Sequence, residues 1–244
     1  MNLWAWWTSD SRMLRLHNAE PIHPHSAPRL YRLTEDLARR AGLPMPALYV
    51  IHDPQPNAFA TGRSPERGAV ALTTGLLDLM PEREVAGVIA HELAHIRNRD
   101  TLIMTVTATL AGAISLLAQF GFLFRDRDGR SNPIALLAMM IIAPLAAVLV
   151  QMAISRAREY EADRVGAEIV GDPRALADAL LRLEAHHAGH IMRTAEAHPE
   201  TAHLFIVNPL SGLSFDSLFR THPPTQDRVA RLLAMAGGAG PRGS

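Results

Sequence analysis

The chain has 244 residues, and its 24 Lys and Arg balance its 24 Asp and Glu, so the formal net charge is zero. A neutral chain lacks the excess of positive charge that is typical of nucleic-acid-binding proteins, and we expect no nucleic-acid partner. The absence of cysteine excludes disulfides and thiolate metal sites. Any metal ligand must therefore be His, Asp or Glu.

The N-terminal segment, residues 1–25, contains all three tryptophans of the chain: Trp4, Trp6 and Trp7. Clustered tryptophans are typical of the membrane–water interface. The stretch is too short for a signal peptide or a spanning helix. We therefore predict an N-terminal segment that lies at a membrane interface.

The next part of the chain alternates helix and strand patterns. Residues 28–41 have leucines at helical spacing and are followed by Gly42, a typical helix end. Residues 47–51, 57–63 and 69–73 have the composition of strands, with turn-forming residues between the last two. These strands predict a small antiparallel sheet.

The strongest motif is the HExxH pattern His91-Glu92-Leu93-Ala94-His95, in a segment that begins near Pro81 and has helical periodicity. Two histidines four apart on a helix lie one turn apart on one face, so both imidazoles can bind the same Zn²⁺. Glu92 is placed to take a proton from water activated at such a metal, as a general base does. The competing interpretation, an amphipathic helix with two satisfied histidines, is less compatible with this apolar setting.

Two apolar runs follow, over residues 101–124 and 133–154, joined by a charged turn at 125–130. Each run exceeds the roughly 20 residues needed to cross a bilayer. We predict a transmembrane hairpin that returns the chain to the side it left. The alternative is a pair of helices buried in a soluble domain, which would need an unusually large core for a chain of this size.

A third metal ligand is predicted after the hairpin, in the segment Ser155–Asp163. Glu159 and Asp163 are four apart and hence on one helix face. One of them can bind the metal while the other accepts a hydrogen bond from a ligand histidine. Spacing alone does not distinguish this from a charged, solvated helix end.

Several motifs together resemble the HtpX-type membrane zinc metalloproteases, relatives of the CAAX prenyl proteases. The resemblance is carried by HELAHIRNRD, SRAREYEAD, the NAFATG segment at 57–62, TTGLL at 73–77, HLFIVNPL at 203–210 and THPP at 221–224. The motifs follow the order of the family. Family members usually begin with two transmembrane helices, so this chain corresponds to either a truncated form or a natural short variant.

The resemblance implies roles for individual residues. It makes Glu159 the third ligand of one Zn²⁺ per chain, beside His91 and His95, and it makes Asp163 the carboxylate that supports a ligand histidine. Glu161 is expected to be exposed and to take no part. His222 is expected to face the cleft and to donate to the tetrahedral oxyanion.

Two further expectations concern the residue that holds the segment of His222 and the strand that binds substrate. Arg228, in a predicted helix over residues 225–235, is expected to hold the segment of His222 in place. An edge strand can bind an extended peptide by main-chain hydrogen bonds. The candidate edge comprises Asn57, Ala58, Phe59 and Ala60.

We therefore predict an α+β, predominantly helical protein with a zincin-like metalloprotease domain formed by residues 26–100 and 155–236. The transmembrane hairpin, residues 101–154, is inserted into it, and residues 237–244 form a flexible tail. The expected function is a zinc endopeptidase of the bacterial inner membrane that degrades misfolded or damaged membrane proteins. Its partners are polypeptide substrates and the lipid bilayer, and the resemblance places its active site on the cytoplasmic face. Two alternatives stay open: an inactive zinc-binding membrane scaffold and a CAAX-type protease of prenylated peptides.

Overall fold

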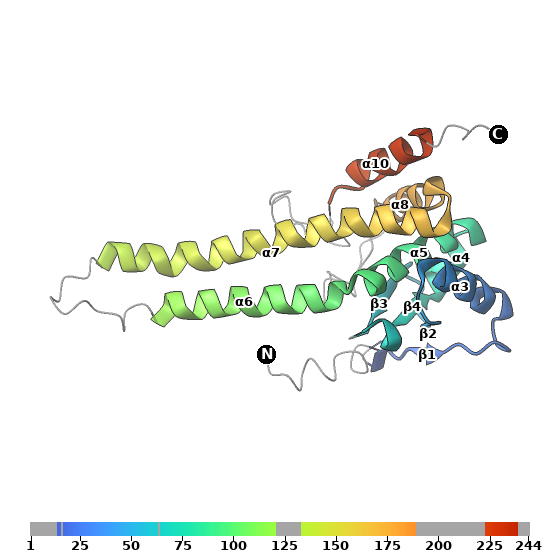
Figure 1. Ribbon diagram of the computed structural model, residues 1–244, viewed down its shortest axis with the longest axis horizontal. Coiled ribbons are helices and arrows are strands. Elements are labelled where there is room, and N and C mark those ends of the chain that lie inside the picture. Colours follow the sequence, from blue (N-terminus) through green and yellow to red (C-terminus); the bar gives the residue numbers. More distant parts are fainter. Residues whose placement is uncertain (1–13, 16, 63, 121–132, 189–222, 239–244) are drawn as a thin grey trace.

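The structure is a computed structural model of the whole chain, and it describes residues 14–15, 17–62, 64–120, 133–188 and 223–238. Helices predominate, and a small sheet lies near the N-terminal end of the described part (Figure 1). The elements in chain order are β1 (Glu20–Pro21), α3 (Pro28–Ala41), β2 (Ala47–Ile51), β3 (Ala58–Thr61), the 3-10 turn η1 (Pro65–Arg67), β4 (Ala69–Thr73), α4 (Thr74–Leu79), α5 (Glu82–Asn98), α6 (Asp100–Phe120), α7 (Pro133–Val170), α8 (Pro173–Ala188) and α10 (Thr225–Gly238).

The first predicted helix is confirmed with both of its ends. Proline stands at the first position of α3, where its missing N–H costs no hydrogen bond. Gly42 ends the helix in the left-handed region at φ 70°, and its N–H bonds the carbonyl of Arg39. Leu37 and Ala38 on the inner face are buried, so helix periodicity predicted the packing face correctly.

The three predicted strands are present, but the prediction of an antiparallel sheet is wrong. The sheet is mixed, with the order β1-β2-β4-β3. β2 and β4 pair in parallel, from Ala47 opposite Ala69 to Ile51 opposite Thr73, whereas β3 and β4 pair as an antiparallel hairpin. After β2 the chain passes over the position next to it and forms β3 one place further out. The following strand, β4, then fills the position between β2 and β3. β4 lies between β2 and β3 and is buried at every residue, in agreement with its mostly apolar sequence.

The core lies around α5, which packs between the sheet and helices α7 and α8 (Figure 1). Val88, Ile89 and Leu93 on this helix are fully buried. Each such side chain contributes about 1.5–3 kcal/mol by leaving water. Gly166 on α7 permits a particularly close approach, because a Cβ there would lie 2.9 Å from the Cα and the backbone N of His91.

Helices α6 and α7 lie side by side and extend away from the part that holds the sheet (Figure 1). The second apolar run and the segment of Glu159 form one continuous helix, α7, of 38 residues. Large apolar side chains on both helices are exposed, namely Leu102, Val106, Leu110, Leu116, Ile142, Leu145, Val148, Leu149 and Val150.

Within the described ranges, no helix combines the length and the apolar character required of a membrane span.

Some predictions lie outside the described residues. These concern the tryptophans of the N-terminal segment, the charged turn at 125–130, the motif at 203–210 and His222. The end of the predicted tail, from residue 239, also lies outside them. These predictions stay predictions.

Candidate metal centre

Helix α5 places His91 and His95 one turn apart, facing the same neighbour, α7. His91 has 1% of its side chain exposed and His95 has 19%. Their Nε2 atoms point toward each other at 3.1 Å. The rings meet nearly edge to face, with centroids 4.6 Å apart. Two imidazole nitrogens that converge in this way inside a protein form half of a metal site.

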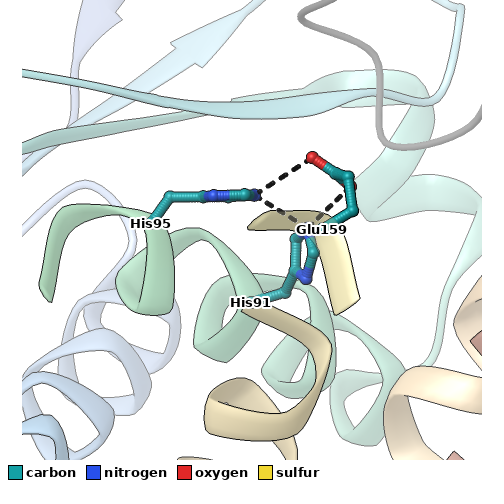
Figure 2. Close-up of side chains that lie close together, drawn as sticks. All are labelled: His91, His95 and Glu159. Atoms are coloured by element: carbon teal, nitrogen blue, oxygen red, sulfur yellow. Dashed lines mark hydrogen bonds and ion pairs between the residues drawn. The ribbon is translucent and has the colours of Figure 1, made fainter. Parts of the chain in front are cut away.

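Glu159 belongs to α7, which packs against α5, and its carboxylate faces the two histidines (Figure 2). Its carboxylate oxygens lie 3.8 Å from His91 Nε2 and 3.6 Å from His95 Nε2. Ligands about 2.0–2.1 Å from a tetrahedral Zn²⁺ stand roughly 3.3–3.4 Å from one another. The two Nε2 atoms, 3.1 Å apart, are close to this value, and each has a different oxygen of Glu159 nearby, Oε2 at 3.8 Å from His91 and Oε1 at 3.6 Å from His95. The three side chains therefore fit a zinc ion without rearrangement of the helices.

Behind His91 lies a buried carboxylate–arginine pair. Oδ1 of Asp163 is 3.1 Å from His91 Nδ1, the ring nitrogen turned away from the centre. Arg228 of α10 donates to both oxygens of Asp163, at 2.6 and 2.7 Å, and its guanidinium lies 3.6 Å from Glu159 Oε2. Arg228 is 1% exposed. The C-terminal helix is thus anchored directly behind the metal centre.

Behind His95 lies a second pair that sequence reasoning missed. Nδ1 of His95 is 2.7 Å from Oδ2 of Asp100, the first residue of α6. Arg158 of α7 donates through Nε to the other oxygen of Asp100, and its Nη2 also contacts that oxygen. Helical spacing does not predict a contact between residues five apart. The contact is made possible by a helix break at Arg99, which has a left-handed φ of 57°, and the residue type at this position gives no signal of that break.

The four carboxylates of the site, Glu92, Asp100, Glu159 and Asp163, outnumber its two arginines, Arg158 and Arg228. Burial opposes a positive charge on His95, but the hydrogen bond with Asp100 and the carboxylates of Glu159 and Glu92 outweigh it and raise its pKa to about 9. Burial by itself would raise the pKa of Asp163, yet the charge and hydrogen bonds of Arg228 keep it below its ordinary value. The centre is thus an anionic pocket that attracts a cation.

The two remaining glutamates of the motifs have different settings. Glu92 is 3% exposed, between the two histidines in the sequence, and its charge acts on both His95 and Arg228. Glu161 has 38% of its side chain exposed and bonds Arg164 on the outside of α7. Only Glu92 is therefore available to chemistry at the centre.

The predicted substrate strand is at the edge of the sheet. Within the described residues β3 pairs with β4 alone, which leaves its other side open to a further strand. Asn57 just before it is buried, and its Oδ1 accepts from the N–H of Ala58 while Thr73 donates to its carbonyl. Ala58 and Phe59 are buried and Ala60 is partly buried. The polar atoms of Asn57 thus hold the strand in place.

Comparison with known proteins gives a consistent result. Residues 24–236 match peptidase family M48. The chain is 56% identical over 239 residues to "Protease HtpX homolog" of Ralstonia pickettii (strain 12J), covering 97% of this chain and 84% of the relative. It is 55% identical, with the same coverage, to "Protease HtpX homolog" of Burkholderia thailandensis.

A solved structure shares the fold. The crystal structure of S. mikatae Ste24p matches with a TM-score of 0.64 at 19% identity, over 92% of this chain and 54% of that one. The chain therefore spans about half the length of Ste24p. The likeness extends to nearly all of the present fold.

Proposed function

This chain belongs to peptidase family M48, and on that premise we propose that it is a membrane-associated zinc metalloprotease whose metal is held by His91, His95 and Glu159. The observation that carries the proposal is the convergence of these side chains at ligand spacing. The high identity to HtpX homologues over almost the whole chain supports the same activity.

The proposed reaction is hydrolysis of a peptide bond. A bound zinc ion would supply Lewis-acid chemistry, acidifying a water and polarising the scissile carbonyl. Glu92 takes the proton from the attacking water and passes it to the leaving amine. Asp163 and Arg228 keep His91 oriented, because a ligand histidine needs its outer nitrogen fixed.

A donor for the oxyanion is proposed at His222. Its support is the family motif and the position of Arg228, which follows it by six residues in the sequence and binds Asp163 behind the metal centre. A hydrogen bond to the developing negative charge strengthens in the transition state and so accelerates the reaction.

Substrate is proposed to bind as an extended segment along the edge strand β3. The open edge supports this proposal, since main-chain groups there can pair with any sequence. Recognition through the backbone suits a protease that acts on unfolded segments of many proteins. We accordingly propose misfolded or damaged membrane proteins as substrates.

A membrane location is proposed for the pair α6–α7, crossing the bacterial inner membrane with the catalytic part on the cytoplasmic side. The exposed leucines, valines and isoleucine of these helices support it, since large apolar surfaces are rarely left in water. The match to HtpX homologues supports it as well.

The activity is tested with the Glu92→Gln variant. An amide cannot take the proton, so this variant should keep the metal and the fold and lose cleavage of an unfolded substrate such as casein. Wild-type cleavage should stop with a chelator and return with zinc. Wild-type protein that binds zinc without cleaving casein or a membrane-protein fragment would favour the inactive scaffold, and cleavage confined to prenylated peptides would favour the CAAX-type activity.

The topology is tested with single cysteines, because the native chain has none. Gly129→Cys and Glu161→Cys should react with an impermeant thiol reagent from opposite sides of the membrane. Labelling of both positions from the same side would contradict the crossing.

A further inference from the structure

We propose that Asp100 and Arg158 are positioning residues of the metal centre, which orient His95 and connect it to the base of the helix pair α6–α7. The inference rests on the proposed zinc site. It assigns a role to two residues that the motifs of the sequence leave unused.

The geometry around His95 is that of an oriented ligand. Oδ2 of Asp100 lies 2.7 Å from Nδ1, while Nε2 faces His91 and Glu159 (Figure 2). A hydrogen bond from Nδ1–H to a carboxylate leaves the lone pair of Nε2 for the metal. Asp100 therefore selects the tautomer and the ring orientation that zinc requires.

This contact depends on the break between α5 and α6. In an uninterrupted helix, residues advance about 100° each, so a residue five further on would point about 140° away from His95. Arg99 instead adopts φ 57° and ends α5, its N–H bonding the carbonyl of Ile96. The chain turns there, and Asp100 at the start of α6 comes back to the ring of His95.

Arg158 completes the arrangement from the other helix of the pair. It donates to Oδ1 of Asp100, across 58 residues of sequence, so the carboxylate is held from both sides. Asp100 is 7% exposed and Arg158 is 24% exposed. Asp100 is the first residue of α6 and Arg158 belongs to α7, so their contact joins the two helices at the start of α6, next to the end of α5. A change in how the two helices meet is thereby transmitted to a metal ligand.

The test measures zinc affinity of the full-length chain in detergent by competition with a chromophoric chelator. Asp100→Ala should weaken zinc binding by about 10–100-fold, the usual effect of losing a partner of a ligand histidine. Asp100→Asn keeps an oxygen acceptor but loses the charge, so its loss should be smaller. The visible spectrum of the Co²⁺ form should change in both variants, because it reports the ligand geometry.

Arg158→Gln tests the second part of the proposal. Arg158 acts on His95 only through Asp100, so Arg158→Gln should weaken zinc binding less than Asp100→Ala. The double variant should bind zinc no more weakly than Asp100→Ala alone. Additive losses would show that Arg158 acts by another route and would overturn its assignment.

The matched control is the pair Glu84–Arg182, which joins α5 to α8. Glu84 has 4% of its side chain exposed and accepts two hydrogen bonds from Arg182, at 2.6 and 2.8 Å, two turns before His91. Glu84→Ala removes a comparable carboxylate without touching a ligand. It should lower the thermal stability and leave both zinc affinity and the Co²⁺ spectrum unchanged.

The outcomes separate the two proposals. Wild-type protein without zinc affinity would contradict the proposed function itself. Wild-type affinity that Asp100→Ala and Arg158→Gln both retain, with an unchanged Co²⁺ spectrum, would overturn the positioning role. Should Asp100→Ala fail to fold, Asp100→Asn and Arg158→Gln decide the question by the same measurements.

Discussion

The supports of the two ligand histidines have the same composition but differ in geometry and surroundings. His95 Nδ1 makes a hydrogen bond of 2.7 Å with its aspartate, whereas His91 Nδ1 has an ion-pair contact of 3.1 Å. Each has its outer nitrogen next to an aspartate, and each aspartate is held by an arginine. The aspartate–arginine pair beside His91 is buried, with 1% of the Arg228 side chain exposed. The support of His95 is partly open, with Arg158 24% exposed.

The difference reflects where each support comes from. Asp163 and Arg228 belong to helices α7 and α10, so the support of His91 exists only when the whole fold is assembled. Asp100 follows His95 closely in the chain and reaches it through one backbone turn. One half of the centre therefore depends on global packing, and the other half depends on the junction with α6.

The largest effect is expected from Glu159→Ala, because Glu159 faces both histidines. Zinc should be lost whichever support remains, and elemental analysis of the purified variant checks this. Glu161→Ala is the control on the same helix, since Glu161 bonds Arg164 outside the centre. Retention of zinc by Glu159→Ala together with its loss in Glu161→Ala would show that the ligand is Glu161 and would contradict the proposed site.

Asp163→Ala should destabilise the fold more than Asp100→Ala. Removing one partner of a buried ion pair costs about 3–5 kcal/mol, and Arg228 is deeply buried. Arg158 is partly exposed, so water can solvate its guanidinium when Asp100 is removed and offset part of the loss of stability. Chemical denaturation of both metal-free variants measures the two free energies of unfolding. Equal losses would show that the buried and the partly open support do not differ energetically.

Gly166→Ala tests the packing on the side of His91. A Cβ there would stand 2.9 Å from the backbone of His91, so α7 must move away from α5. Overpacking of this kind costs about 1–3 kcal/mol, and zinc affinity should fall with it. The control is Gly112→Ala on α6, where nothing lies within 4 Å and the change should stabilise by up to about 1 kcal/mol. Similar thermal stability of both variants would contradict the close approach.

The smallest effect is expected from Arg99→Gly, on the side of His95. A left-handed conformation costs a side-chain-bearing residue about 1 kcal/mol relative to glycine, so the variant should be stabilised by that order. Zinc affinity should be unchanged, since Asp100 keeps its place. Asn98→Gly, one residue earlier and still helical, should destabilise instead. A less stable Arg99→Gly protein would mean that the arginine side chain itself holds the junction.

Part of this arrangement could be predicted from the sequence. The spacing of His91 and His95, and that of Glu159 and Asp163, follows from the helical period, which is a local property of the backbone. The same holds for α3 and its end at Gly42, where the residue type suits the left-handed conformation. Family motifs then selected Glu159 over Asp163 as the expected ligand, a choice that spacing had left open.

What the sequence by itself determined is therefore local: the elements, their inward faces and the pairs of residues that share one helix face. Only the tertiary structure decided the rest. The strand order could not be read, because parallel pairing of β2 and β4 requires a crossover that places β3 on the far side of β4, and no local pattern specifies that placement. Asp100 could not be assigned to His95, because arginine at position 99 carries no preference for the left-handed turn that joins them. Such contacts arise from the balance of interactions among distant segments, and no single segment encodes that balance.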